Sequence, residues 1–165
     1  MKFIMTFCLL ALQSWAALPS KSKMEQGLLL GAGFITGGKA GSGFSILDIR
    51  LSSAKNEVRE RLVFEMGDMY MRPLKGSPPY FHVEKKTNPS RIDISFAQTG
   101  VSKVDEKTLM QKLKRSALVR DARMIYDPED KGILVSIDLK PNALVKVMES
   151  EGTQGAAKIV IDLLQ

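Results

Sequence analysis

Few residues in this sequence have the types and spacing that catalysis or metal binding requires. The chain holds one histidine, His82, and one cysteine, Cys8. A single histidine offers little for a serine–histidine–aspartate triad or for a histidine-rich metal site. His82 also lies in an alternating run of hydrophobic and polar residues, which favours a position on the face of a strand. We therefore expect no catalytic residue, no metal and no cofactor.

The acidic residues do not indicate an active site either. Asp127, Glu129 and Asp130 gather in one turn, which allows a loosely held calcium ion or a solvated hairpin turn. The loop lacks the full run of ligands that calcium takes, so we favour the hairpin turn. A glycosidase needs two converging carboxylates, and no motif here indicates such a pair. We expect a protein that is not an enzyme; an enzyme with an unrecognised carboxylate pair is the alternative.

Basic side chains are the better indication of function. The formal net charge is +6 at pH 7, which favours anionic partners: acidic polymers, phospholipid head groups or nucleic acids. Between Lys103 and Arg123, seven Lys or Arg residues stand against three acids. They predict a basic patch on a helix and its exit, and a merely solvated helix face is the alternative. The three tyrosines are too few and too scattered for base stacking.

Arginine and tyrosine in the strand-rich region add further candidates. The planar guanidinium of arginine suits carboxylates and phosphates, groups that cell-wall polymers carry. Tyr80 follows Pro78 and Pro79 and would form an aromatic platform for a sugar ring, whereas Phe81 on the opposite face is expected in the core. The candidate ligand-binding residues are Arg61, Tyr80, Arg91, Lys112, Arg115 and Arg120.

The elements that would carry these residues are mostly strands. From Ser45 onward, hydrophobic and polar residues alternate with a period of two, the pattern of half-buried strands. Turn-forming residues separate the runs. We predict a mostly β, two-sheet sandwich of about eight short strands, at residues 47–51, 61–66, 80–84, 91–96, 122–126, 133–139, 145–147 and 159–163.

One amphipathic helix is expected among the strands, at about residues 105–117. The segment is free of Gly and Pro, and Leu109, Leu113 and Ala117 recur every four residues. Acids begin it and bases follow, as the helix dipole prefers. A narrow apolar stripe would therefore dock this helix on the sheet.

The first 16 residues are typical of a signal peptide. Lys2 precedes a short apolar stretch, and Ser14 and Ala16 are the small residues that a signal peptidase needs, which predicts cleavage after Ala16. The apolar stretch is shorter than the roughly 20 residues that span a bilayer; a permanent N-terminal anchor is the alternative. We expect a periplasmic protein with no membrane span after cleavage, without cysteine and without a nucleic-acid partner.

Residues 17–44 are predicted to form a Gly-rich flexible linker. Seven of the 13 glycines lie between positions 27 and 44, and glycine is entropically costly to order. A phosphate-binding loop needs Gly-Lys-Ser/Thr, but Ala40 follows Gly38-Lys39 here. The hydrophobic residues 28–30 and 34–35 are expected to dock on the domain or on a partner.

The strand region, residues 45–165, contains an internal echo. Each half reads strand, strand, turn, strand, and the last strand carries an aliphatic–Asp–aliphatic signature, at 92–94 and at 161–163. Two such units would pack face to face, because neither can bury its apolar face alone. The alternative is that any meander of amphipathic strands repeats in this way.

This pattern resembles the AMIN domain, a β-sandwich module of bacterial periplasmic cell-wall amidases and type IV pilus secretins. The similarity spans residues 45–165 and rests on the opening strand 46–51 and the strand that begins at Arg61. It rests further on the Asn-Pro-Ser-Arg-Ile-Asp-Ile segment at 88–94 and the closing strand 159–163. The resemblance implies a targeting module that binds peptidoglycan or a peptidoglycan-associated partner.

Two functional hypotheses follow. The first is a non-catalytic periplasmic module that binds the cell wall, with peptidoglycan or another anionic envelope polymer as its ligand. The second is an assembly or chaperone-like partner of an envelope secretion or pilus machine, which would use exposed strand edges or the apolar segment 28–35.

Overall fold

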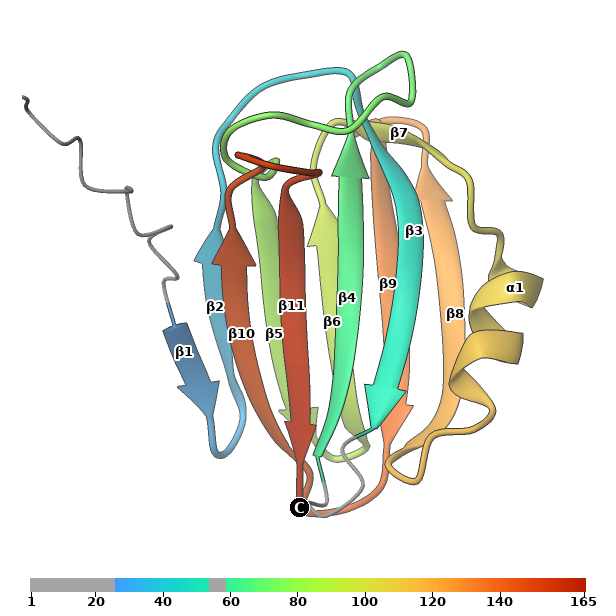
Figure 1. The fold of residues 1–165 in the computed structure, drawn as a ribbon. Helices are drawn as coiled ribbons and strands as arrows, with labels where there is room; N and C mark the ends of the chain where they lie inside the picture. Colours follow the sequence, from blue (N-terminus) through green and yellow to red (C-terminus); the bar gives the residue numbers. More distant parts are fainter. Residues whose placement is uncertain (1–25, 54–58) are drawn as a thin grey trace, which may run out of the picture.

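The protein is described by a computed structural model that covers residues 26–53 and 59–165. In these ranges the chain forms eleven strands and one α-helix, and the strands build two sheets packed face to face (Figure 1). The predicted mostly β, two-sheet sandwich with one helix is confirmed. The expected count of about eight strands was too low, because short strands at the sheet edges carry no clear alternation.

The first sheet has six strands and the second has five. Neighbouring strands are antiparallel throughout, except that β3 and β7 run parallel. The first sheet has the order β1 (Gln26–Leu29), β10 (Leu144–Ser150), β11 (Lys158–Leu164), β4 (Arg59–Gly67), β3 (Phe44–Ser53), β7 (Thr99–Ser102). The second sheet has the order β2 (Gly33–Gly37), β5 (Phe81–Thr87), β6 (Ser90–Phe96), β9 (Gly132–Leu139), β8 (Val119–Asp127).

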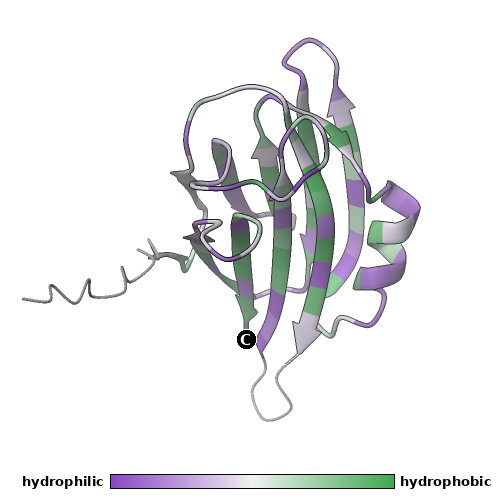
Figure 2. Cartoon of the chain, turned by 45° about the horizontal axis from the view of Figure 1, so that its top comes forward, coloured by the Kyte–Doolittle hydropathy of each residue, from purple (hydrophilic) through white to green (hydrophobic). Residues whose placement is uncertain are grey.

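The core lies between the sheets and is built by the alternating residues. Hydrophobic and hydrophilic positions alternate along the strands in Figure 2, and the inward ones are almost fully buried. Phe64 of the first sheet packs on Phe96 of the second, with ring centroids 5.0 Å apart. Each large side chain buried in this way contributes about 2 kcal/mol to folding. Burial of this inner layer is what holds the two sheets together.

Two positions depart from the predicted alternation. Leu47 was expected to point inward, but the register of β3 against β4 shifts between Ile46 and Asp48, so Ile46 takes the buried position instead. Tyr126 was expected in the core, yet it lies near the end of edge strand β8 and is 52% exposed. A bulge and a strand end are local features that a period-two pattern does not reveal.

The prediction of a flexible linker is wrong for Gln26–Leu29 and Gly33–Gly37, which form strands, whereas residues 17–25 lie outside the described ranges. β1 pairs with β10 of the first sheet and β2 with β5 of the second, so the β1–β2 segment joins the two sheets along one side. Leu29 and Ile35 pack against the core. The buried Lys85 ammonium donates to the backbone carbonyls of Leu29 and Leu30, and burial lowers the pKa of Lys85.

The helix α1 (Glu106–Leu113) covers the opposite side of the sandwich, beside β8 and close to β3 (Figure 1). It is shorter than the predicted 105–117. Asp105 caps its N-terminus by accepting a hydrogen bond from the Thr108 amide at 2.8 Å. Leu109 and Leu113 are buried as expected, but Ala117 lies beyond the helix and is exposed.

A buried carboxylate ends the helix early. Glu60, at the start of β4, accepts hydrogen bonds from the Ala117 amide at 2.6 Å, the Leu118 amide at 3.4 Å and the Ser116 hydroxyl. These groups belong to the turn that leads from α1 into β8, and Glu60 itself is 4% exposed. The chain therefore turns at residue 114 rather than continuing as helix.

The strand order repeats as the predicted internal echo requires: the run β10-β11-β4-β3 of the first sheet corresponds to β5-β6-β9-β8 of the second. The expectation that the two halves pack face to face as separate units is wrong, because each half gives two strands to each sheet. Asp48 and Asp121 occupy equivalent places: each follows a register shift, and each accepts a hydrogen bond from the next residue's amide at 2.9 Å. An arginine follows two residues after each of them.

No helix among the described residues has the length and hydrophobicity that a membrane span requires.

Removing the Glu60 carboxylate should loosen the turn that positions α1. We expect Glu60→Ala to lower the free energy of unfolding by about 2 kcal/mol, because the Ala117 amide and the Ser116 hydroxyl lose their carboxylate acceptor while the Leu118 amide keeps only the Ser116 oxygen. Urea denaturation followed by circular dichroism measures the change. Glu129→Ala, in the exposed turn before β9, is the matched control and should stay within about 0.5 kcal/mol of the parent. Equal effects of the two variants would contradict the assigned role of Glu60.

Candidate binding grooves

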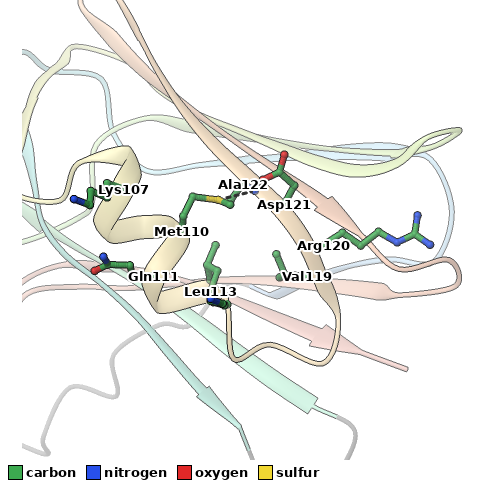
Figure 3. A pocket seen from close by; sticks show the side chains of 9 residues that line it. Lys107, Met110, Gln111, Leu113, Val119, Arg120, Asp121 and Ala122 are labelled. Carbon is green, nitrogen blue, oxygen red and sulfur yellow. Dashed lines mark hydrogen bonds between the residues drawn. The ribbon is translucent and has the colours of Figure 1, made fainter.

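The helix α1 lies between two grooves. One runs between α1 and β3 and has a volume of about 570 Å³; we call it the β3 groove. The other runs between α1 and β8 and has a volume of about 560 Å³; we call it the β8 groove (Figure 3). They lie on either side of the narrow apolar stripe, Leu109 and Leu113, that α1 buries against the sandwich. The other helix positions are left to line the grooves.

Helical spacing decides which residues line which groove. Residues three or four apart share one face of a helix. Thr108, Lys112 and Arg115 therefore line the β3 groove, and Lys107, Met110 and Lys114 line the β8 groove. The predicted basic patch is thus divided by the helix: Lys112 and Arg115 lie on one side, Lys114 and Arg120 on the other.

The β3 groove is polar and positively charged. The Lys112 ammonium donates to the Asp48 carboxylate at 2.5 Å and to the Ile49 carbonyl at 2.8 Å. Burial alone would raise the pKa of Asp48, but hydrogen bonding and the positive charge of Lys112 outweigh it and hold that pKa below its ordinary value. Arg50 pairs with Asp48 at 3.2 Å and also with Glu65. Asp48 thereby orders two cations at the floor of the groove.

Arg115 differs from these two cations. It is exposed, and no ion pair or hydrogen bond of its side chain is found among the described residues. Ser53, Thr108 and Gln111 line the same groove and add two hydroxyls and an amide. The groove thus presents an unpaired guanidinium beside neutral hydrogen-bonding groups. Such a set can bind a carboxylate or phosphate and the hydroxyls of an attached sugar.

The β8 groove is more apolar. Met110, Leu113, Val119 and Ala122 form its inner surface, while Lys107 and Lys114 border it on the helix side and Arg120 on the strand side. Figure 3 shows Met110 extending from α1 toward Ala122, and Arg120 pointing away from the helix. This lining suits an amphipathic ligand with negative charge better than it suits a sugar.

Arg61 and Arg91 lie on opposite outer faces of the sandwich, and neither lines the β3 groove or the β8 groove. Arg91 borders a separate hollow that it shares with Asp121 and Arg123 of β8. Arg61 on β4 forms a two-point ion pair with Asp162, with Nε–Oδ1 at 2.6 Å and a second bond at 2.8 Å. Asp162 is 3% exposed. Arg91 on β6 pairs with Asp138 on β9 at 2.8 Å, and both side chains are 36% exposed. Both arginines cross-link neighbouring strands, so their guanidinium groups are already engaged.

Tyr80 borders a third hollow, of about 340 Å³, at one end of the second sheet. It is 43% exposed, whereas Phe81 is buried as predicted. His82 lies on the outer face of β5, the predicted position, and stacks on Phe34 of β2 with centroids 5.3 Å apart. The structure therefore does not bring Tyr80 together with the basic residues of α1.

The acidic turn between β8 and β9 has the form of a hairpin turn. The Asp127 carboxylate accepts hydrogen bonds from the amides of Glu129 and Asp130, at 2.9 and 3.2 Å. Within residues 26–53 and 59–165, no three side chains of His, Cys, Asp or Glu lie together in a way that would hold a metal ion.

Comparison with known proteins adds no identification: no family model, no curated protein and no solved structure matches this chain. What the fold and grooves define is a two-sheet β-sandwich flanked by a basic helix. The resemblance to the AMIN domain stays a prediction.

The two arginine pairs should differ in their effect on stability. Arg61→Ala leaves the Asp162 carboxylate buried without its partner, so we expect a loss of about 2 kcal/mol in the free energy of unfolding, reduced from the full cost of a broken buried pair because Arg61 is partly exposed. Arg91→Ala breaks a half-exposed pair and should cost less than about 1 kcal/mol. Urea denaturation of both variants checks the order; the reverse order would contradict it.

Proposed function

We propose that this protein is an exported, non-catalytic module that binds peptidoglycan, or another anionic polymer of the bacterial cell envelope, through the β3 groove. The observation that supports this most directly is Arg115, an exposed guanidinium without an ion pair among the described residues, set beside the ordered cations Lys112 and Arg50. A ligand carboxylate at Arg115 makes a charge-assisted hydrogen bond, the stronger kind of surface contact.

The rest of the groove suits a glycan with acidic substituents. Ser53, Thr108 and Gln111 can exchange hydrogen bonds with sugar hydroxyls, and the half-buried Leu51 adds apolar surface. The groove lies at the surface along one side of α1, so a ligand that continues in both directions need not end inside it. These properties fit a polymer better than a small metabolite, which is normally enclosed.

The proposed location follows from the N-terminal segment. A signal peptide at residues 1–16 would deliver the protein to the periplasm, where the cell wall lies. The mature chain keeps a formal net charge of +5, since only Lys2 is removed from the +6 of the full chain. A basic protein is attracted to an acidic polymer over a distance of about 10 Å at moderate salt.

A second function has its own support. Leu28, Leu30 and Phe34 in the β1–β2 segment are 52%, 67% and 66% exposed. Neighbouring exposed hydrophobic residues at a sheet edge are typical of a protein-interaction surface. They favour the alternative of an assembly partner for an envelope secretion or pilus machine.

Reversing the charge of Arg115 should weaken binding to the wall. In a pull-down with purified sacculi at low salt, we expect Arg115→Glu to be retained about fivefold less than the parent, roughly the loss of 1 kcal/mol of binding free energy. Lys75→Glu is the matched control: it makes the same charge change on the loop before β5, where the ammonium lies 3.4 Å from the Gly155 carbonyl. Equal retention of the two variants would refute this site, and no retention of the parent above an unrelated β-sandwich would refute wall binding.

Export is tested separately. We expect the protein recovered from the periplasm to begin at residue 17, because Ser14 and Ala16 meet the requirements of a signal peptidase. Intact-mass spectrometry of the recovered protein measures the cleavage. A protein that keeps residue 1 and remains with the membrane fraction would instead support the N-terminal anchor.

A further inference from the structure

The strand β8 has an edge beside the β8 groove that no other strand occupies in the described part of the chain. It is the last strand of the second sheet, next to β9. Two of its amides donate to side chains rather than to another strand. The Ala122 amide donates to the Met110 sulfur at 3.2 Å and to its neighbour Asp121 at 2.9 Å. The Met124 amide donates to the Glu106 carboxylate at 3.0 Å.

The Met110, Asp121 and Glu106 side chains take the place that the carbonyls of a neighbouring strand would have. A thioether sulfur is a weak acceptor, and the Asp121 contact is a local one between adjacent residues. Methionine is also flexible, so Met110 can move aside at little cost. Both amides are therefore satisfied in the free protein. A backbone carbonyl is a better acceptor than the sulfur for the Ala122 amide, whereas the Met124 amide already has a charged acceptor in Glu106.

The groove beside this edge has the size and lining to hold a peptide strand. Leu113 and Val119 supply apolar surface for every second side chain of an extended segment. Lys107, Lys114 and Arg120 border the groove, against one lining acid, Asp121. Because Arg123 lies 3.8 Å from Asp121, that acid is partly neutralised. The side chains that border the groove therefore carry a net positive charge, which favours a ligand with negative charge.

We propose that the β8 groove binds an extended acidic segment of a partner protein, which adds to β8 as a new edge strand of the second sheet. A backbone carbonyl of the segment accepts from the Ala122 amide in place of the Met110 sulfur, and the next carbonyl along the segment reaches the Met124 amide beside the Glu106 carboxylate. Alternate side chains of the segment rest on Leu113 and Val119, and its acids pair with the bordering cations. Strand addition of this kind takes affinity from the main chain and specificity from the pockets.

This inference is independent of wall binding. The β3 groove lies on the other side of α1 and is lined with hydroxyls and an amide, whereas the β8 groove combines an apolar lining with a strand edge. A glycan offers no regular row of carbonyls to an edge strand. Either groove can therefore fail its test while the other passes.

The test is an NMR titration of the ¹⁵N-labelled protein with an acetylated heptapeptide of alternating glutamate and valine. We expect the largest amide shifts at Ala122 and Met124, and slower hydrogen exchange of both amides in the complex. A peptide with lysine in place of glutamate should bind at least fivefold more weakly. Shifts confined to other strands, or equal binding of both peptides, would overturn the proposal.

Two variants sharpen the result. Arg120→Glu should weaken the acidic peptide about fivefold, with Lys114→Glu as the substitute if the first variant does not fold. Met110→Leu keeps the volume but removes the sulfur acceptor, so it should bind the peptide more tightly than the parent by about twofold. Lys75→Glu is the control and should leave the affinity unchanged. Unchanged binding in Arg120→Glu and Lys114→Glu would overturn the assignment of charge.

The same NMR titration tests whether two other kinds of ligand bind in the β8 groove. Muropeptides and dodecyl phosphate are titrated as probes of a wall fragment and of an anionic amphiphile. If either shifts the Ala122 and Met124 amides while the acidic peptide does not, the groove is not a site for strand addition. Weaker shifts from these probes than from the peptide support the proposal.

Discussion

The position of α1 depends on one buried carboxylate. Glu60 stands at the start of β4 and accepts hydrogen bonds from the turn that follows the helix, so the first sheet fixes where α1 ends and where β8 begins. The helix buries two leucines on the sandwich and bonds to β3 through Lys112 and to β8 through Met110 and Glu106, so Glu60 acts together with these contacts in placing α1 between the grooves. A buried charge is costly unless it is fully hydrogen-bonded, and here the turn supplies the donors.

The other side of the sandwich is covered by different means. Two sheets packed face to face leave open sides through which water would reach the core. The β1–β2 segment covers one of them with a strand on each sheet, and the buried Lys85 ammonium binds the carbonyls at its turn. The β-sandwich is thus covered by this segment opposite the helix, and a buried polar side chain with backbone partners holds each cover, Lys85 on one side and Glu60 on the other.

The two grooves beside α1 give the module two different surfaces. The β3 groove combines an arginine that has no ion pair among the described residues with hydroxyls and an amide, the groups that suit an acidic glycan. The β8 groove combines a strand edge with an apolar lining, the features that suit a peptide. The two proposals together describe a protein that connects the cell wall with another envelope protein, with the helix between the two ligands.

The sequence by itself determined the two-sheet β architecture, the core and the basic character of the helix region. A period of two places Phe64, Ile92 and Ile94 inside regardless of the fold's details, because burial is a property of each strand. Only the tertiary structure decided what depends on contacts between distant segments. Glu60 and Ser116, which form a hydrogen bond, are 56 residues apart in the sequence. The many glycines between positions 27 and 44 predicted a linker, but pairing with β10 and β5 makes β1 and β2 strands. Strand order and register likewise decide that aspartates on neighbouring strands pair with Arg61 and Arg91. The position of α1 decides that the basic patch is divided. No local sequence pattern encodes either result.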